Sequence, residues 1–262
     1  YYYFIIMNLI NIFILVVLLF IIINNNIISI DKFTSHPIKI AVVVPCVPKH
    51  IQYLKGLFNS INNQTKLPNK VIISLSGSND KEGKVVKELY SPILNPSIEL
   101  IVDCVELKQN AAENRNRSIK HCNDIDYIAF MDADDEMCPN KIKLITDLMI
   151  LHKADMGLHN YSNGHSNKNE AMCSNGTRVI SPEEMAIRES NNRKHLHLSK
   201  LSVHHGHPII SKKLFSKLKQ NIKYVRGQDS KYVRDTFKHH FRVVYTDAKL
   251  SKYFFRRSSG GT

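Results

Sequence analysis

Tryptophan is absent from this sequence, and its five cysteines contain no CxxC pair. An odd number of unclustered cysteines argues against a zinc ribbon and against a complete disulfide framework. Charge is also missing from the first 30 residues, because Asp31 and Lys32 are the first charged side chains. Without basic flanking residues, the positive-inside rule gives this segment no orientation in a membrane.

A long apolar run fills the uncharged segment. From Phe4 to Ile23 every residue except Asn8 and Asn11 is apolar, and about twenty helical residues span the hydrocarbon core of a bilayer. We expect residues 1–30 to form a membrane anchor and spacer, so that the protein is a single-pass membrane protein with an uncleaved signal-anchor. A cleaved signal peptide fits less well, because the run exceeds a normal h-region and no small-x-small cleavage pattern follows.

Basic residues outnumber acidic ones, with 36 Lys and Arg against 23 Asp and Glu and a net charge of +13. Such a balance favours anionic partners. The excess is spread along the chain, without an arginine-rich block or a zinc-finger spacing, so no nucleic-acid partner is expected. The charge is suited instead to attracting an anionic substrate.

Strand and helix patterns alternate after the spacer, which predicts an α/β fold with a mostly parallel central sheet flanked by helices. Strands are expected at 38–44, 71–75, 98–102 and 127–131, and helices at 51–61, 81–90, 111–121 and 139–152. Beyond residue 155 we expect a long loop at 160–176, helices from Ser181, at 211–219 and at 229–237, and strands at 241–245 and 253–255.

Three carboxylates crowd into Asp132-Ala133-Asp134-Asp135, directly after the apolar run 127–131. Their mutual repulsion is most readily tolerated when a divalent cation neutralises it. The carboxyl end of a buried strand is also where open α/β sheets bind ligands. The alternative is that these acids cap the helix near Pro139, but a cap requires one acid. The pattern predicts a metal-assisted site for an anionic substrate.

Several motifs, in order, resemble the family 2 glycosyltransferases of the GT-A fold over about residues 38–257. They are Val42-Val-Val-Pro-Cys, Leu57-Phe-Asn-Ser-Ile-Asn-Asn-Gln-Thr-Lys-Leu-Pro, Asn114-Arg-Asn-Arg, Phe130-Met-Asp-Ala-Asp-Asp and Gly227-Gln-Asp-Ser-Lys-Tyr. The resemblance implies a GT-A domain at 31–262, with a donor and metal half at 31–152 and an acceptor half at 153–262. It also implies inverting transfer of a sugar from a nucleotide diphosphate donor to a glycan, lipid or protein acceptor, assisted by Mn²⁺ or Mg²⁺.

The resemblance assigns roles to individual residues. Asp134 would bind the metal, Asp132 would lie beside the donor ribose and the metal, and Asp135 would support them or cap a helix. Asp229 would be the base that takes the acceptor proton, the alternative being a surface acid at a helix start. Donor contacts are implied for Pro45, Cys46, Ser76, Arg115 and Ala133, and an acceptor contact for Gln228; a solvated Arg115 is the alternative.

The sequence departs from the family pattern at three places. Ser76 stands where the family usually has a base-contacting Asp, Gln228 replaces a Glu, and no histidine follows His240 to serve as a late metal ligand. Arg256 and Arg257 are candidates to neutralise the leaving diphosphate in its place. The cluster His195, His197, His204, His205 and His207 allows a zinc site or a wall of the acceptor pocket, and the second, with His207 best placed, is favoured.

Two other function classes remain open at this stage. A haloacid-dehalogenase-like phosphatase also places Asp-x-Asp after an apolar strand, although there the motif usually opens the domain. A catalytically silent relative that only binds a nucleotide sugar or a carbohydrate is compatible with Gln228 and with the missing base-contacting Asp.

Overall fold

A computed structural model describes residues 37–165, 173–190, 201, 203–224 and 227–255. The expected anchor at 1–30 lies outside the described residues, as do His195, His197, Arg256 and Arg257. Among the helices that are described, none has the length and apolar character to cross a membrane. From Lys39 onward, the described residues form one compact unit.

The first half of the sheet is parallel, as the strand and helix alternation predicts. Its order is β3-β2-β1-β4, and every pairing in it is parallel. The strands are β1 (Ile40–Cys46), β2 (Lys70–Ser76), β3 (Glu99–Val105) and β4 (Tyr127–Phe130). All seven residues of β1 are buried, because a central parallel strand is covered on both faces, which explains its β-branched sequence.

The second half of the sheet is mixed, so the prediction of a mostly parallel sheet is correct only for the first half. The order continues from β4 as β8-β6-β9-β5, with β7 paired to β9. These strands are β5 (Glu136–Met137), β6 (Met156–Asn163), β7 (Val179–Ile180), β8 (Ile209–Ser211) and β9 (Val243–Tyr253). In this half β6 and β9 are parallel, whereas β4–β8, β6–β8, β5–β9 and β7–β9 are antiparallel.

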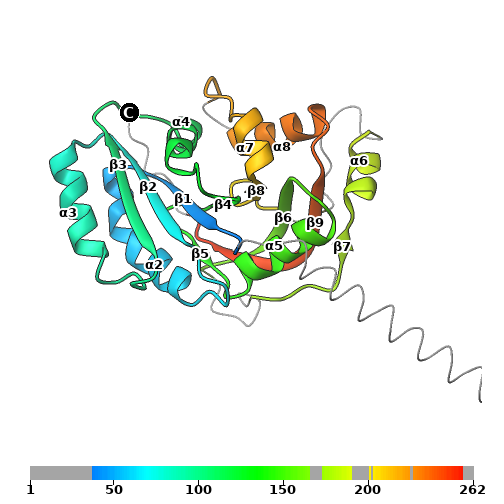
Figure 1. Cartoon of the computed structure of the whole chain (residues 1–262), viewed down its shortest axis with the longest axis horizontal. Helices are drawn as coiled ribbons and strands as arrows, with labels where there is room; N and C mark the ends of the chain where they lie inside the picture. The colour runs from blue at the N-terminus through cyan, green and yellow to red at the C-terminus, as the bar shows by residue number, and fades with distance from the viewer. Residues whose placement is uncertain (1–36, 166–172, 191–200, 202, 225–226, 256–262) are drawn as a thin grey trace, which may run out of the picture. The chain divides into compact units, whose positions relative to one another are not determined.

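Helices cover both faces of the sheet (Figure 1). They are the 3₁₀ helices η1 (Pro48–Tyr53) and η2 (Ile119–His121) and the α-helices α2 (Leu54–Asn62), α3 (Asp80–Tyr90), α4 (Ala111–Ser118), α5 (Lys141–Leu151), α6 (Pro182–Ser190), α7 (Lys212–Lys217) and α8 (Gln228–Lys238). Figure 1 shows α4 on the same side as α7 and α8, with α5 on the other side. Hydrogen bonds join α4 to α8 and the end of α2 to the start of α5.

Two predictions for the second half are wrong. The strands expected at 241–245 and 253–255 are parts of one strand, β9. The loop expected from residue 160 begins later, because β6 continues to Asn163 by pairing with β9 through two register shifts. Polar residues inside β9 hide the strand in the sequence, yet Thr246 and Ser251 are buried.

Candidate active site

The acidic motif lies at the carboxyl edge of the parallel strands. Val43 of β1 pairs with Phe130 of β4, and the amide of Met131 donates to the carbonyl of Val43. The chain then turns, with the amide of Asp135 donating to the carbonyl of Asp132 at 3.3 Å. The four residues 132–135 therefore follow the carboxyl end of β4, as the sequence predicts.

Arg115 joins two of the predicted site residues. It is only 1% exposed, and its Nη2 atom lies 2.8 Å from Oδ1 of Asp132 while its Nη1 atom pairs with Oδ1 of Asp229. Nη2 also donates to the carbonyl of Gly206 at 3.2 Å. Burial disfavours the cation, but the carboxylates of Asp229 and Asp132 outweigh that effect and raise the pKa of Arg115. The alternative of a solvated arginine is thereby excluded.

The position of Arg115 follows from how α4 begins. A capping box formed by Asn110 and Glu113 starts the helix. Gln228, at the start of α8, accepts a hydrogen bond through Oε1 from the amide of Ala112 at 3.0 Å and donates through Nε2 to the carbonyl of Tyr224. Gln228 thus holds α8 against α4, and both polar ends of its side chain are directed at the protein rather than at an acceptor.

The three acids of the motif have different surroundings. Asp135 is buried, accepts from the amide of Phe254 at 2.7 Å and lies 3.1 Å from Nε2 of His207. It does not cap α5, which begins after Asn140 without a side-chain cap. Asp134 is half-buried, and burial together with the charges of Asp135 and Asp132 raises its pKa. A bound cation would offset the repulsion between these carboxylates.

His207 lies behind the acids rather than on an open pocket wall. It is fully buried, with Nε2 3.1 Å from Asp135 and 3.6 Å from Asp132, and its ring stacks on His204 at 3.7 Å between centroids. Burial alone would lower its pKa, but the hydrogen bonds to Asp132 and Asp135 raise it. The prediction that His207 lines the acceptor pocket therefore does not match its enclosed position.

The described residues include one group whose side chains could share a metal ion, namely Asp135, His204 and His207, with ligand atoms within 4.8 Å of one another. The predicted ligand Asp134 is not a member. A cation at Asp134 would therefore take most of its ligands from water and from substrate phosphates, which is common for Mg²⁺ in nucleotide-dependent enzymes. The raised pKa of Asp134 and its place at the ligand-binding edge fit such a cation.

The remaining predicted donor contacts lie at the ends of β1 and β2 and in the acidic motif. Pro45 and Cys46 end β1 and are buried, and Ala133 is 1% exposed. Burial raises the pKa of the Cys46 thiol to about 12, which keeps it protonated. Ser76 is buried, and its hydroxyl donates to the carbonyl of Gln109 and accepts from Asn114. The hydroxyl hydrogen of Ser76, which a nucleotide base would need as its hydrogen-bond partner, is therefore already used within the protein.

Two residues of the site escape prediction from the sequence. A Cβ atom at Gly206 would lie 3.3 Å from Oδ2 of Asp229 and 3.4 Å from Oδ2 of Asp132, so glycine lets the backbone pass between the two acids. Its setting in His204-His-Gly-His207 is the signal that could have shown it. Lys141 is fully buried, and its ammonium donates to Oγ of Ser251 at 3.0 Å. The position of Lys141 at the start of an amphipathic helix does not indicate that its side chain is buried.

Parallel strands that end at an acidic turn, continued by a mixed second half, define the GT-A class of nucleotide-sugar transferases. Solved structures agree, although identities below 20% show the fold alone. Staphylococcus aureus TarS 1–349 in complex with UDP-GlcNAc is 18% identical, with a TM-score of 0.61 over 86% of this chain and 62% of that one. Mycobacterium tuberculosis glucosyl-3-phosphoglycerate synthase with Mn²⁺, UDP and glucosyl-3-phosphoglycerate is 16% identical, with a TM-score of 0.57 over 83% of this chain and 72% of that one.

The sequence profile described as "Glycosyl transferase family 2" matches residues 41–241, and the chain belongs to that family of glycosyltransferases. A curated relative, the "Uncharacterized glycosyltransferase YibD" of Escherichia coli K12, is 23% identical over 230 residues. The match covers 84% of this chain and 62% of that relative. The resemblance read from the motifs is thus confirmed at the level of the family.

Proposed function

We propose that this chain transfers a sugar, with inversion, from a nucleotide diphosphate sugar to an acceptor hydroxyl. The observation that carries the proposal is the meeting of Asp132 and Asp229 on Arg115, which brings one acid from the end of β4 and one from the start of α8 to the same cation. Two structural neighbours were solved with UDP or UDP-GlcNAc, so a UDP-sugar is the first donor class to test.

Asp229 is the proposed general base. Its side chain is 35% exposed, so that an acceptor can reach it, whereas Arg115 behind it is buried. The ion pair fixes the direction of the carboxylate, and a base must be oriented in this way to accept the acceptor proton as the new bond forms. Gln228 leaves this role intact, because it ties α8 to α4.

Asp134 is the proposed metal ligand, with Asp132 beside it. A divalent cation such as Mn²⁺ or Mg²⁺ would stabilise the charge of the departing nucleoside diphosphate. The neighbouring synthase was solved with Mn²⁺ and UDP, which supports the choice of ion. Asp132 is held by Arg115 and His207, so its carboxylate stays ionised and oriented at the edge where the donor is expected.

Nothing specific in the structure favours the other function classes. Gln228, which suggested a silent relative, has a structural partner in Ala112, and the family match sets the phosphatase aside. We further propose that the uncharged N-terminal segment anchors the protein to a membrane, and that the acceptor is a glycan, a lipid or a protein.

The test is release of the leaving nucleotide (UDP, GDP or CMP) by the full chain from a panel of UDP-, GDP- and CMP-sugars, with Mn²⁺, Mg²⁺ or chelator. Wild type should be active with one donor and a metal, and Asp134→Ala and Asp229→Asn should each lose on the order of a hundredfold or more. Asp147→Ala, an exposed acid on α5, is the matched control and should retain activity. Equal, slow release by wild type and both site variants would refute the proposal.

A further inference from the structure

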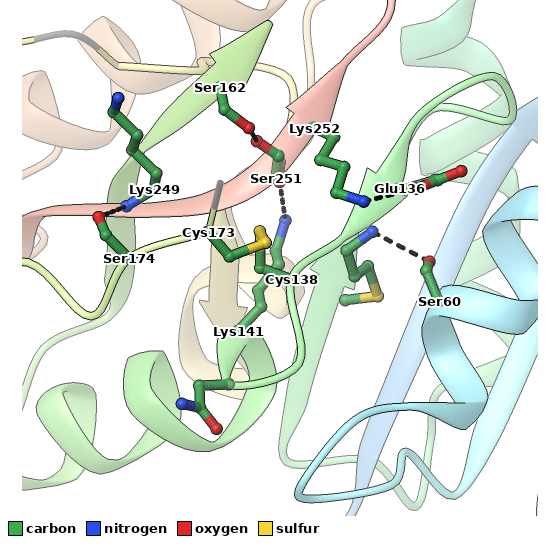
Figure 2. Close-up of a disulfide and its surroundings, with 12 residues drawn as sticks. Ser60, Glu136, Cys138, Lys141, Ser162, Cys173, Ser174, Lys249, Ser251 and Lys252 are labelled. Atoms are coloured by element: carbon green, nitrogen blue, oxygen red, sulfur yellow. Dashed lines mark hydrogen bonds and ion pairs between the residues drawn. A yellow bond between two sulfur atoms is a disulfide. The ribbon is translucent and has the colours of Figure 1, made fainter. Parts of the chain in front are cut away.

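A disulfide joins the chain that follows β5 to the chain that precedes β7. Cys138 comes directly after β5, Cys173 precedes β7, and their Cα atoms are 5.7 Å apart (Figure 2). Ser174 exchanges two hydrogen bonds with Lys249 of β9, which fixes the segment next to the bond. Cys46, Cys104 and Cys122 are unpaired. Stable disulfides form in oxidising compartments and are rare in the cytosol.

The chain also carries four Asn-x-Ser/Thr sequons, at Asn63, Asn116, Asn160 and Asn175, and the fold separates them into two kinds. The amide of Asn116, on α4, donates to the carbonyl of Gln220 at 2.8 Å and accepts from its amide at 2.9 Å. Asn160 is half-buried within β6. A glycan on Asn116 would break a contact one residue from Arg115, so this position is incompatible with the modification.

Asn63 and Asn175 are exposed and have room for a glycan. Asn63 follows the last turn of α2. Asn175 opens a turn whose Gly176 has φ of +70° and whose Thr177 is held by Asp247. The Asn175 side chain accepts a hydrogen bond from Asn140 through its carbonyl oxygen, and not through the nitrogen that a glycan would occupy.

Both exposed sequons lie on one face, beside the disulfide. Asn140, two residues after Cys138, donates to Asn175 at 2.9 Å and accepts from Thr65, the threonine of the Asn63 sequon, at 3.1 Å. Thr65 lies just before β2 begins, at the amino edge of the parallel strands, whereas the acidic motif lies at their carboxyl edge. Glycans on this face leave the donor edge open.

The Asn175 sequon is also distant from the acidic motif, as measured along β9. Asp247, which holds Thr177, precedes Tyr253 by six residues, and the next residue, Phe254, contacts Asp135. Six strand residues span roughly 20 Å. The protein thus has a disulfide and two accessible sequons on one face, away from the site. This combination is typical of proteins of the secretory compartments.

We propose that the catalytic domain matures in an oxidising, glycosylating compartment, where it receives N-linked glycans on Asn63 and Asn175 and the Cys138–Cys173 bond. In the glycosylation step, each Asn Nδ2 forms a bond to the anomeric carbon of a lipid-linked oligosaccharide. The bond from that carbon to the lipid diphosphate breaks, and the amide proton is lost to a base of the transferring enzyme. In the oxidation step, two thiols pass two electrons and two protons to the disulfide of an exchange catalyst, which is reduced.

The experiment is translation of the full chain in the presence of endoplasmic-reticulum microsomes, followed by peptide N-glycosidase digestion and peptide mapping. Wild type should carry two glycans, Asn63→Gln and Asn175→Gln should each remove one, and Asn116→Gln should remove none. Thr177→Ser keeps both the sequon and a hydroxyl for Asp247, so it should retain the second glycan. Alkylation of the denatured chain before reduction should label Cys46, Cys104 and Cys122 but not Cys138 or Cys173.

Two results would overturn the proposal. The first is a chain without glycans in which Cys138 and Cys173 are alkylated, which places the domain in the cytosol. The second is glycan on Asn116 with Asn63 and Asn175 empty. The experiment measures neither donor nor acceptor, so its outcome is independent of the transferase activity.

Discussion

Arg115 and Asp132 form a buried ion pair, with 2.8 Å between Nη2 and Oδ1. Because of this pair, the three crowded acids differ in their surroundings. Arg115 balances Asp132, His207 lies against Asp135, and the charges of those two acids raise the pKa of Asp134. A bound cation would offset the burial and the neighbouring charges that raise the pKa of Asp134.

Replacing Arg115 by Ala should destabilise the protein strongly. Removing one partner of a fully buried ion pair costs about 3–5 kcal/mol; here Asp132 and Asp229 lose their partner but are 31% and 35% exposed, so water offsets part of that cost. Urea unfolding measures the loss. Lys120→Met removes a cation close by, but its side chain is 56% exposed, and it should change stability by less than about 0.5 kcal/mol. Equal stability of the two variants would contradict the role of Arg115.

His207 should make stability depend on pH. Its folded-state pKa is raised by the hydrogen bonds to Asp132 and Asp135 despite burial, so the folded state binds the proton more tightly than the unfolded chain. The stabilisation is fully present below the ordinary histidine pKa of about 6.5 and is lost as pH rises through the folded-state value. The urea midpoint of wild type should exceed that of His207→Gln at low pH, and the difference should shrink as pH rises. A pH-independent difference between the two proteins would be the contrary result.

Gly206→Ala should impair activity more than stability. The added Cβ would lie 3.3 Å from Oδ2 of Asp229, 3.3 Å from Cε1 of His204 and 3.4 Å from Oδ2 of Asp132, distances tight enough to displace both acids. Such contacts require the neighbours to give by a few tenths of an ångström, a small cost in stability, whereas rate is sensitive to the placement of reacting groups, with about 1 Å costing on the order of a hundredfold; we therefore expect a smaller but measurable loss of turnover. Thermal unfolding and donor turnover on the same samples separate the two effects. The control is Gly56→Ala, whose Cβ would approach the side chain of Glu136 instead.

The first half of the fold can be predicted because its signals are local. Strand β1 reads as β-branched and is buried throughout, and the helix from Ala111 starts with its own capping box. Strand β9 cannot be predicted in the same way, because its buried Ser251 is satisfied by Lys141, 110 residues away. No local pattern encodes that contact.

The site shows the same division between local and distant information. The acidic motif and Arg115 follow from sequence motifs, but the pairing of Arg115 with Asp229 joins residues 114 positions apart. His207 was expected on a pocket wall as the best-placed member of a histidine cluster, whereas the fold encloses it behind Asp132 and Asp135. Cysteine counting excluded a framework but could not show that Cys138 and Cys173 meet, since only the path of the chain after β6 brings them together.

The disulfide should contribute measurably to stability. With 35 residues separating the cysteines, the chain-entropy model gives about 3–4 kcal/mol for closing the loop in the unfolded state. Cys173→Ser should therefore lower the urea midpoint, and the double variant Cys138→Ser with Cys173→Ser should no longer respond to reductant. Cys104→Ser, at an unpaired and half-buried cysteine, should keep the response. If reductant shifts the double variant as much as wild type, the stabilisation has another origin, because no other described cysteine pair is bonded.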